Sequence, residues 1–187
     1  LSGKTRQLPL VGTVRSLSSS VALAAMLITA APVQAGAYIA LDGSSITLGE
    51  ALGEDSNPRG GRLRLGLRIS ESFDIEAHAG LSSDTGAGAF DRLEASWAGA
   101  YLKGYLPLGE HSALFALGGV AGVELVRSSG ELERADERGG FSYGFGLETA
   151  LTERLDLSAD WMRYLGDGEG DAFDRVDAVS LGLKLYF

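Results

Sequence analysis

The chain has 187 residues, enough for a single domain, and its formal charge is −9. This acidic balance argues against nucleic-acid binding, because phosphates need Lys and Arg to neutralise them. The chain has no cysteine, which excludes disulfides, thiolate catalysis and Cys-ligated metal, and its 27 glycines against 4 prolines favour closely packed strands and turns.

Residues 1–35 have the pattern of a secretory signal peptide. The basic residues Lys4, Arg6 and Arg15 precede an apolar run over 21–30, and small residues end at Ala35. That run is about ten residues long, shorter than the roughly 20 residues that a membrane-spanning helix needs. We therefore predict a cleavable signal peptide over 1–35 and a mature domain over 36–187, located in the periplasm, in the outer membrane or outside the cell.

From residue 36 onward, apolar side chains occupy every second position in successive segments, which indicates strands with one apolar face. The first three strands are predicted over about 37–47, 62–70 and 73–81. Their other face, which we expect to point inward, carries most of the charge. It holds Tyr38, Ala40, Asp42, Arg62, Arg64, Arg68, Asp74, Glu76 and His78.

The next two strands are predicted over about 93–106 and 113–127. In the first of these, Lys103 and Tyr105 face inward and the alternate positions face outward. In the second, the parity is decided by Glu124, which we place inward with the other charges. The side chains then predicted to face outward are Phe115, Leu117, Ala121, Val123 and Leu125.

The last three strands are predicted over about 141–148, 155–165 and 179–187. Large apolar residues alternate with small or polar residues in all three, most regularly in the last. In a membrane barrel such an apolar face meets lipid while the polar face points into the lumen. The predicted inward residues here include Glu148, Asp156, Asp160 and Lys184.

This makes eight strands whose connections alternate between short and long. Short turns are predicted near 71, 109 and 153, and longer loops near 55, 86, 133 (128–138) and 170. Short periplasmic turns and long outer loops are typical of outer-membrane barrels, in which the sheet must close so that every backbone group is paired. The predicted fold is all-β: an eight-stranded antiparallel up-and-down transmembrane β-barrel, preceded by the cleavable signal peptide.

Two segments carry a family resemblance. The hairpin over 151–157, followed by Trp-Met-Arg-Tyr at 161–164, resembles the penultimate hairpin of small outer-membrane barrels of the OmpA-membrane-domain and OmpX kind. The segment 183–187 resembles their terminal strand. The resemblance implies the outer membrane of a Gram-negative bacterium, with its lipids and lipopolysaccharide as surroundings. It also implies that the barrel-assembly machinery recognises Tyr186 and Phe187, and it implies no cofactor.

The predicted lumen contains charges of both signs in nearly equal number. An eight-stranded barrel is wide enough only for its own side chains, so opposite charges should interlock as a structural plug. The alternative is a narrow gated pore that opens when Arg68, Lys103, Glu148 and Lys184 exchange partners. The predicted network consists of Arg62, Arg64, Arg68, Lys103 and Lys184 with Asp74, Glu76, Glu124, Glu148, Asp156 and Asp160.

Catalysis and metal binding find little support in the sequence. The histidines are His78, predicted inward, and His111, in a predicted turn beside Ser112, and neither has both a nucleophile and an orienting group. The acidic loop over 167–171 lacks the Gly and Glu that a calcium loop requires at its later positions, so we expect a solvated loop, with weak divalent binding as the alternative. We predict a non-enzymatic protein without a metal site.

The outward face suggests two lipid contacts. Arg163 falls on this face near the outer end of its strand, where it can meet lipopolysaccharide phosphate at headgroup level. Aromatic residues are expected to form girdles at both interfaces. We assign Trp97, Trp161, Phe141 and Tyr143 to the outer girdle and Phe73 and Phe187 to the inner one.

Overall fold

The computed structural model describes residues 36–48, 58–85, 92–129, 132–165 and 175–187. The predicted signal peptide and the acidic loop over 167–171 lie outside these ranges. Within them no helix is both long and apolar enough to cross a membrane. The strands are β1 (Ala37–Leu48), β2 (Arg59–Arg68), β3 (Phe73–Thr85), β4 (Arg92–Pro107), β5 (Ser112–Ser129), β6 (Leu132–Ala150), β7 (Leu155–Leu165) and β8 (Arg175–Tyr186).

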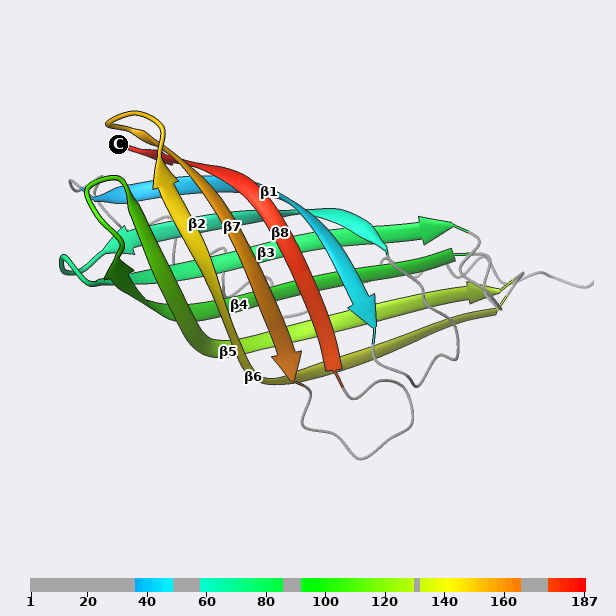
Figure 1. Cartoon of the computed structure of the whole chain (residues 1–187). Coiled ribbons are helices and arrows are strands. Elements are labelled where there is room, and N and C mark those ends of the chain that lie inside the picture. Colours follow the sequence, from blue (N-terminus) through cyan, green and yellow to red (C-terminus); the bar gives the residue numbers. More distant parts are fainter. Residues whose placement is uncertain (1–35, 49–57, 86–91, 130–131, 166–174) are drawn as a thin grey trace, which may run out of the picture.

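The eight strands form a closed barrel in which each strand is antiparallel to its neighbours (Figure 1). β1 pairs with β8 to close the sheet, and Leu41 of β1 lies opposite Leu183 of β8. Closure gives the backbone groups of both terminal strands a partner and removes two sheet edges. The predicted eight-stranded antiparallel barrel is confirmed.

Three short turns, at 69–72, 108–111 and 151–154, join β2 to β3, β4 to β5 and β6 to β7. In the first, the Ile69 N–H donates to the carbonyl of Phe73 at 3.0 Å. The second contains Gly109, whose φ of 125° is one that side chains disfavour. All three lie at the end of the barrel that holds the C-terminus (Figure 1), which we call the turn end. The short turns predicted near 71, 109 and 153 are confirmed.

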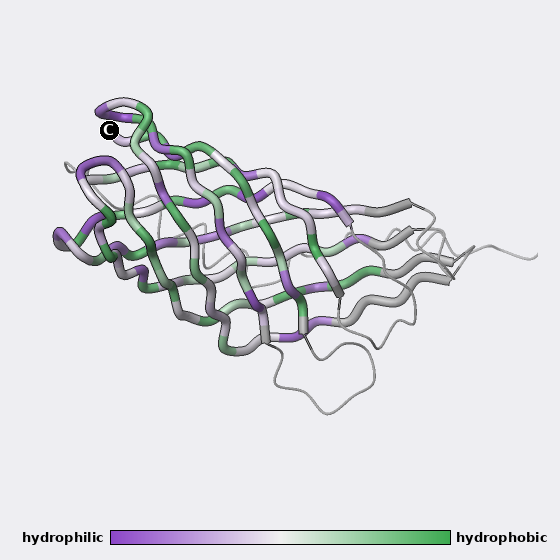
Figure 2. Tube along the Cα trace, in the orientation of Figure 1, coloured by the Kyte–Doolittle hydropathy of each residue, from purple (hydrophilic) through white to green (hydrophobic). Residues whose placement is uncertain are grey.

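Hydropathy alternates along the strands as the pleat requires (Figure 2). The large apolar side chains that this alternation places on the outer face are exposed. The parity predicted for every strand except β5 is confirmed. The large exposed apolar residues include Leu41, Leu63, Phe73, Ile75, Leu81, Leu102, Leu106, Phe141, Phe145, Leu147, Leu157, Val179, Leu181, Leu183, Leu185 and Phe187.

The parity predicted for β5 is wrong. Phe115, Leu117 and Leu125 point into the barrel and are buried, while Leu114 and Val120 are exposed. Glu124 therefore lies on the outer face, and it is not part of the lumen network. Both faces of β5 are mostly apolar, so a single acidic residue decided the prediction, and that residue lies toward the end of the strand remote from the turns.

Apolar side chains fill the half of the interior farther from the turn end. Ile46 lies near the end of β1, Val176 near the start of β8 and Leu125 toward the end of β5, and all three are buried in one cluster. Together with Val123, Met162 and Ala178 of the same cluster, they form what we call the apolar cap. The lumen is thus polar only in part, which explains why an apolar face of β5 can point inward.

Trp97 belongs to this interior and not to the outer aromatic girdle, so that part of the girdle prediction is also wrong. It is only 4% exposed, and its ring lies over Gly80 of the neighbouring strand β3. Glycine leaves the space on the inner face of β3 that the indole ring fills. A Cβ atom at residue 80 would lie 2.2 Å from that ring.

Replacing Gly80 with alanine is expected to lower the free energy of unfolding by about 1–3 kcal/mol, because the methyl group overpacks against Trp97. Gly43→Ala is the matched control, since Gly43 is exposed and the nearest atom to an added Cβ is the Leu181 carbonyl oxygen at 4.0 Å. Urea unfolding in phospholipid vesicles measures both. An equal loss in the two variants would contradict this packing.

β5 and β6 are the longest strands, with 18 and 19 residues. The loop predicted over 128–138 is wrong for 128–129, which end β5, and for 132–138, which are strand and pair with β5. The charged residues of this segment suggested a loop. A pair of hydrogen-bonded strands can carry charged side chains where it extends beyond the hydrocarbon region. β7 pairs with β6 only over 142–150, so the described ladders give 132–141 a neighbour on the β5 side alone.

Candidate functional site

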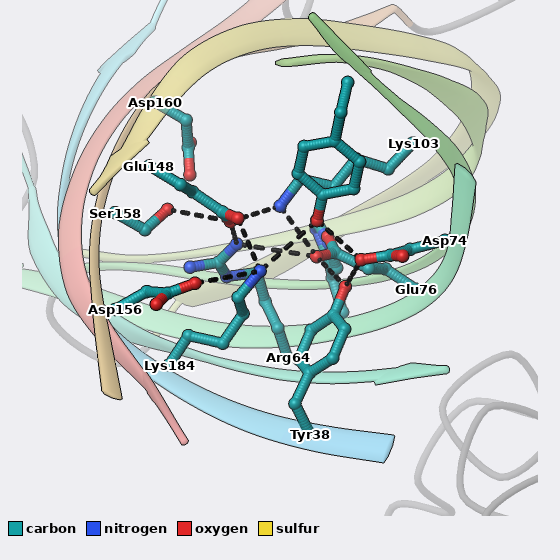
Figure 3. Close-up of polar contacts among 12 residues, drawn as sticks. Tyr38, Arg64, Asp74, Glu76, Lys103, Glu148, Asp156, Ser158, Asp160 and Lys184 are labelled. Atoms are coloured by element: carbon teal, nitrogen blue, oxygen red, sulfur yellow. Dashed lines mark hydrogen bonds and ion pairs between the residues drawn. The ribbon is translucent and has the colours of Figure 1, made fainter. Parts of the chain in front are cut away.

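Charged side chains from different strands point toward one another inside the barrel (Figure 3). They come from the inward positions of seven strands, all except β5. Arg68 and Asp156 are partly exposed at the turn end. We call the whole set, which also contains the buried residues Asp42, Arg62, Arg64, Asp74, Glu76, Lys103, Glu148, Asp160 and Lys184, the ionic network.

Glu148 of β6 is shared by two lysines from different strands. Lys103 of β4 donates to one carboxylate oxygen and Lys184 of β8 to the other. Both lysine side chains are fully buried, so each ammonium depends on the protein to replace its lost hydration. Ser158 adds a hydroxyl at 3.5 Å, and Asp156 lies 3.8 Å from the Lys184 Nζ.

Glu76 of β3 joins this arrangement to the neighbouring strands. Its Oε1 accepts from Lys103 at 3.0 Å, and its Oε2 lies 2.6 Å from the His78 Nε2. The Tyr38 hydroxyl lies 2.6 Å from Glu76 and 2.9 Å from Asp74, so its single proton can serve only one of the two carboxylates at a time. The Tyr38 hydroxyl can therefore donate its hydrogen bond either to Glu76 or to Asp74.

Two arginines of β2, Arg62 and Arg64, share the carboxylate of Asp42. Arg62 donates through Nε to Asp42 at 2.8 Å and through Nη2 to Asp160. Arg64 makes two bonds of 2.8 Å to Asp42. A planar guanidinium can form several charge-assisted hydrogen bonds in a fixed geometry, which makes arginine suitable for buried ion pairs.

A layer of tyrosines and charges closes the mouth at the turn end. Asp74 accepts from Arg68 at 3.2 Å and from the Tyr105 hydroxyl at 2.5 Å. Arg68 also donates to the Tyr186 hydroxyl at 3.0 Å, and that hydroxyl donates to Asp156 at 3.1 Å. The guanidinium of Arg68 lies over the rings of Tyr105 and Tyr186, which holds it across the opening.

Ten of the eleven residues predicted for the network lie in the lumen, and the exception is Glu124. Of the four predicted gate residues, Lys103, Glu148 and Lys184 meet directly, whereas Arg68 pairs with Asp74. The prediction omitted Asp42, although alternation had already placed it inward. The hydroxyls of Tyr38 and Tyr105 were also missed as linkers, and their inward parity was the signal that could have found them.

The histidines have structural neighbours. His78 contacts Glu76 and packs against Tyr101, with ring centroids 4.3 Å apart. His111 is exposed in the turn over 108–111, at the turn end of the barrel. Across the described ranges no three His, Asp or Glu side chains are grouped so that they could hold a metal ion.

On the outer face, Arg163 and Asp177 form a two-bond ion pair of 2.7 and 2.9 Å between β7 and β8. The Arg163 guanidinium lies 4.9 Å from the ring centroid of Trp161. Trp161 continues into a row of outward rings with Tyr143 and Phe145, at centroid distances of 5.9 and 5.2 Å. Phe73 and Phe187, predicted for the inner girdle, are exposed at the turn end.

Several known proteins are similar to this chain. Neisserial surface protein A (NspA) aligns with a TM-score of 0.70 and 17% identity, over 81% of this chain and 97% of that one. Ail, the attachment invasion locus protein of Yersinia pestis, gives 0.59 and 16%, over 82% and 97%. The outer membrane enzyme PagL gives 0.52 and 14%, over 79% and 99%. At these identities the structures show a shared fold and nothing more.

No curated protein sequence matches the chain. The sequence model of the family described as "Outer membrane protein beta-barrel domain" matches residues 19–187, nearly the whole chain. The barrel with its apolar outer surface agrees with that match. The chain belongs to the outer membrane protein beta-barrel domain family, and it resides in the outer membrane of a Gram-negative bacterium.

Proposed function

We propose that the protein is a non-catalytic barrel with a permanently closed lumen and a structural or interaction role at the cell surface. The interlocked ionic network supports closure most directly, because Glu148 ties β4, β6 and β8 together across the lumen. The apolar cap blocks the same axis a second time. A solute would have to break both layers to pass.

Planar-bilayer recording on the pure protein tests this closure. We expect a flat baseline without discrete steps, because each lumen charge would lose its partner on opening. Heat-modifiable migration on a denaturing gel confirms that the same sample is folded. Steady unitary conductance from folded protein would contradict the closed plug.

A narrow gated pore is the second candidate. It is favoured by the alternative acceptors near the two lysines, since Lys103 lies 3.0 Å from Glu76 and Lys184 lies 3.8 Å from Asp156. Each lysine can transfer from Glu148 to another carboxylate without becoming unpaired. If the barrel is a gated pore, we expect planar-bilayer recording to show unitary conductance steps, and we expect these steps to be more frequent in Glu148→Gln.

The longest strands support an interaction role. Glu124 and Glu137 lie opposite each other on the outer face of the β5–β6 pair, in the part remote from the turn end. The strand segment 132–141 has a ladder on one side only in the described structure, and such an edge can pair with an added strand.

A catalytic role has a simple test, since release of an acyl chain from lipid A by the pure protein would contradict the proposal.

Lipopolysaccharide contact by Arg163 is part of the proposal. The guanidinium is partly exposed, with 25% of its side-chain surface accessible, and it lies beside Trp161 on the outer face. Arg163→Gln is expected to weaken lipopolysaccharide binding about tenfold, the effect of losing one charge-assisted hydrogen bond. Titration of lipopolysaccharide into the pure protein measures this. Arg154→Gln, in the 151–154 turn at the other end, serves as control and should bind as the unmodified protein does.

Recognition of Tyr186 and Phe187 by the barrel-assembly machinery is proposed as well. Phe187 is exposed to the outside at the turn end, where it is accessible to a partner. Tyr186 points into the lumen and donates to Asp156, so we assign it mainly to holding the strand in register. The partner contact is then expected to depend on Phe187 more than on Tyr186.

A further inference from the structure

A row of polar side chains crosses the outer face of β1, β2 and β3, in the part remote from the turn end. Arg59 of β2 lies opposite Ser45 of β1 on one side and opposite Ser83 of β3 on the other. All three residues are exposed, whereas Ser44 and Ser82, one position away in the chain, are buried inside the barrel. Each member of the row can donate a hydrogen bond, and we call the three residues the donor row.

The positive charge of Arg59 is not neutralised by a neighbouring side chain. Arg163, which also faces outward, donates two hydrogen bonds to Asp177. Among the described residues, no carboxylate forms such a pair with Arg59. The next carboxylate along the row belongs to Glu94 of β4, which lies opposite Ser83. Two strand spacings separate it from Arg59, about 10 Å, so the donor row favours an anion.

Two glycines lie next to the donor row on its turn-end side. Gly43 of β1 is opposite Gly61 of β2, and this pair lies between Leu181 of β8 and Leu81 of β3. The two leucines are 58% and 70% exposed, so their side chains project from the outer surface. A Cβ atom added at Gly43 or Gly61 would have its nearest neighbour at 4.0 or 3.6 Å, in each case a backbone oxygen. The surface between the leucines is therefore open, and we call it the glycine gap.

The register with β8 places the donor row at the edge of the lipid-facing surface. Ser45 lies opposite Val179, the last of a run of exposed apolar residues at alternate positions of β8. The next outward position of β8 is Asp177, which lies opposite Thr47. In an outer-membrane barrel the apolar band meets hydrocarbon, and charged residues are tolerated near its boundary. The donor row is thus at the level of the lipid headgroups, and the glycine gap faces the hydrocarbon.

A lipid with an anionic headgroup matches both parts of this surface. Phosphate oxygens accept charge-assisted hydrogen bonds from arginine, and they also accept from hydroxyls. A free phosphate would not use the glycine gap, and a neutral lipid would leave the charge of Arg59 unmatched. An acyl chain in the gap gains van der Waals contacts with Leu81 and Leu181 on its two sides.

We propose that the donor row and the glycine gap together form a binding site for lipid A, the phosphorylated anchor of lipopolysaccharide. The phosphate binds to the donor row, with Arg59 as its main partner, and one acyl chain lies in the glycine gap. The inference rests on the proposed contact of the outer face with lipopolysaccharide, but it names a second place for that contact. It depends neither on Arg163 nor on a closed lumen.

Native mass spectrometry tests the site, because it counts the lipid molecules that remain bound to the purified protein. Lipid A is titrated into the protein in detergent, and lipid A stripped of its phosphates is the second probe. Arg59→Gln is expected to weaken lipid A binding about tenfold, the effect of losing a charge-assisted hydrogen bond. The dephosphorylated probe should bind Arg59→Gln and the unmodified protein equally. Unchanged lipid A binding by Arg59→Gln, or an equal effect on both probes, would overturn the proposal.

Arg163→Gln, measured in parallel, separates this site from the contact proposed above. A loss of lipid A binding in Arg163→Gln alone would overturn the donor row and support the contact at Arg163. A loss in Arg59→Gln alone would support the donor row and overturn the contact at Arg163. Losses in both variants would support both sites.

A second variant tests the glycine gap without changing any charge. Gly61→Leu fills the gap, and the space around an added Cβ atom leaves room for the new side chain. It is expected to weaken lipid A binding about fivefold, the effect of losing roughly ten van der Waals contacts. Ala100→Leu, at an exposed position of β4, is the matched control and should bind as the unmodified protein does, while heat-modifiable migration confirms that both variants are folded. Equal affinities of Gly61→Leu and Ala100→Leu would overturn the placement of the acyl chain.

Discussion

Replacing Glu148 with glutamine is expected to lower the free energy of unfolding by about 3–5 kcal/mol, the cost of breaking a buried ion pair from one side. Glutamine keeps the shape of glutamate but removes the charge that Lys103 and Lys184 share. Two buried ammonium groups would then compete for neutral oxygens and for the carboxylates of Glu76 and Asp156. Urea unfolding in phospholipid vesicles measures the change.

Glu124→Gln is the matched control for this experiment. Glu124 also lies within a long strand, but on the outer face, so the same loss of charge should change stability by no more than about 0.5 kcal/mol. Adding Lys184→Gln to Glu148→Gln should recover part of the loss, because one unpaired ammonium is then removed. Comparable losses for Glu148→Gln and Glu124→Gln would contradict the shared contact of Lys103 and Lys184 with Glu148.

Placing arginine at Leu183 should destabilise the protein by about 2–4 kcal/mol, the cost of a cation near the middle of the lipid-facing surface. Leu183 is exposed on the outside of β8, between Leu181 and Leu185. In a soluble barrel the same exposed position would accept arginine without a penalty. The experiment therefore measures lipid contact directly.

Leu106→Arg is its control, and unfolding in vesicles again gives the comparison. Leu106 is also exposed and outward, but it lies one residue from the end of β4 at the turn end. Arginine there can reach water, so the expected cost is about 0–1 kcal/mol. Equal costs at both positions would argue that residue 183 does not lie within the hydrocarbon region.

The sequence predicted most of the architecture because lipid and lumen make opposite demands on alternate positions. Leu181 and Leu183 face one phase while Lys184 faces the other, and this contrast sets the parity of β8 unambiguously. The same contrast is weak in β5, where the interior accepts Phe115 and Leu125 as readily as lipid would. The parity prediction therefore failed for β5, because its inner face and its outer face both meet apolar surroundings.

The pairing inside the lumen could not be predicted from alternation. Alternation shows that Lys103, Glu148 and Lys184 point inward, but it does not show that they meet. The stagger of the strands around the closed barrel decides which side chains reach the same height, and this quantity has no local signature in the sequence. Tyrosine linkers such as Tyr38 were overlooked for the same reason, since the partners of a hydroxyl depend on that height.

The unequal strand lengths place the described strand ends of the outer rim at different heights. At about 3.3 Å per residue and a tilt near 45°, the 19 residues of β6 rise about 45 Å and the 11 residues of β7 about 26 Å. The apolar band of such barrels is only about 25 Å tall, so β7 ends close to the membrane surface. β6 instead extends about 20 Å beyond the apolar band, so this side of the barrel projects farther from the membrane than the β7 side. Among the described residues, a partner approaching from outside the cell would therefore meet the β5–β6 side of the barrel first.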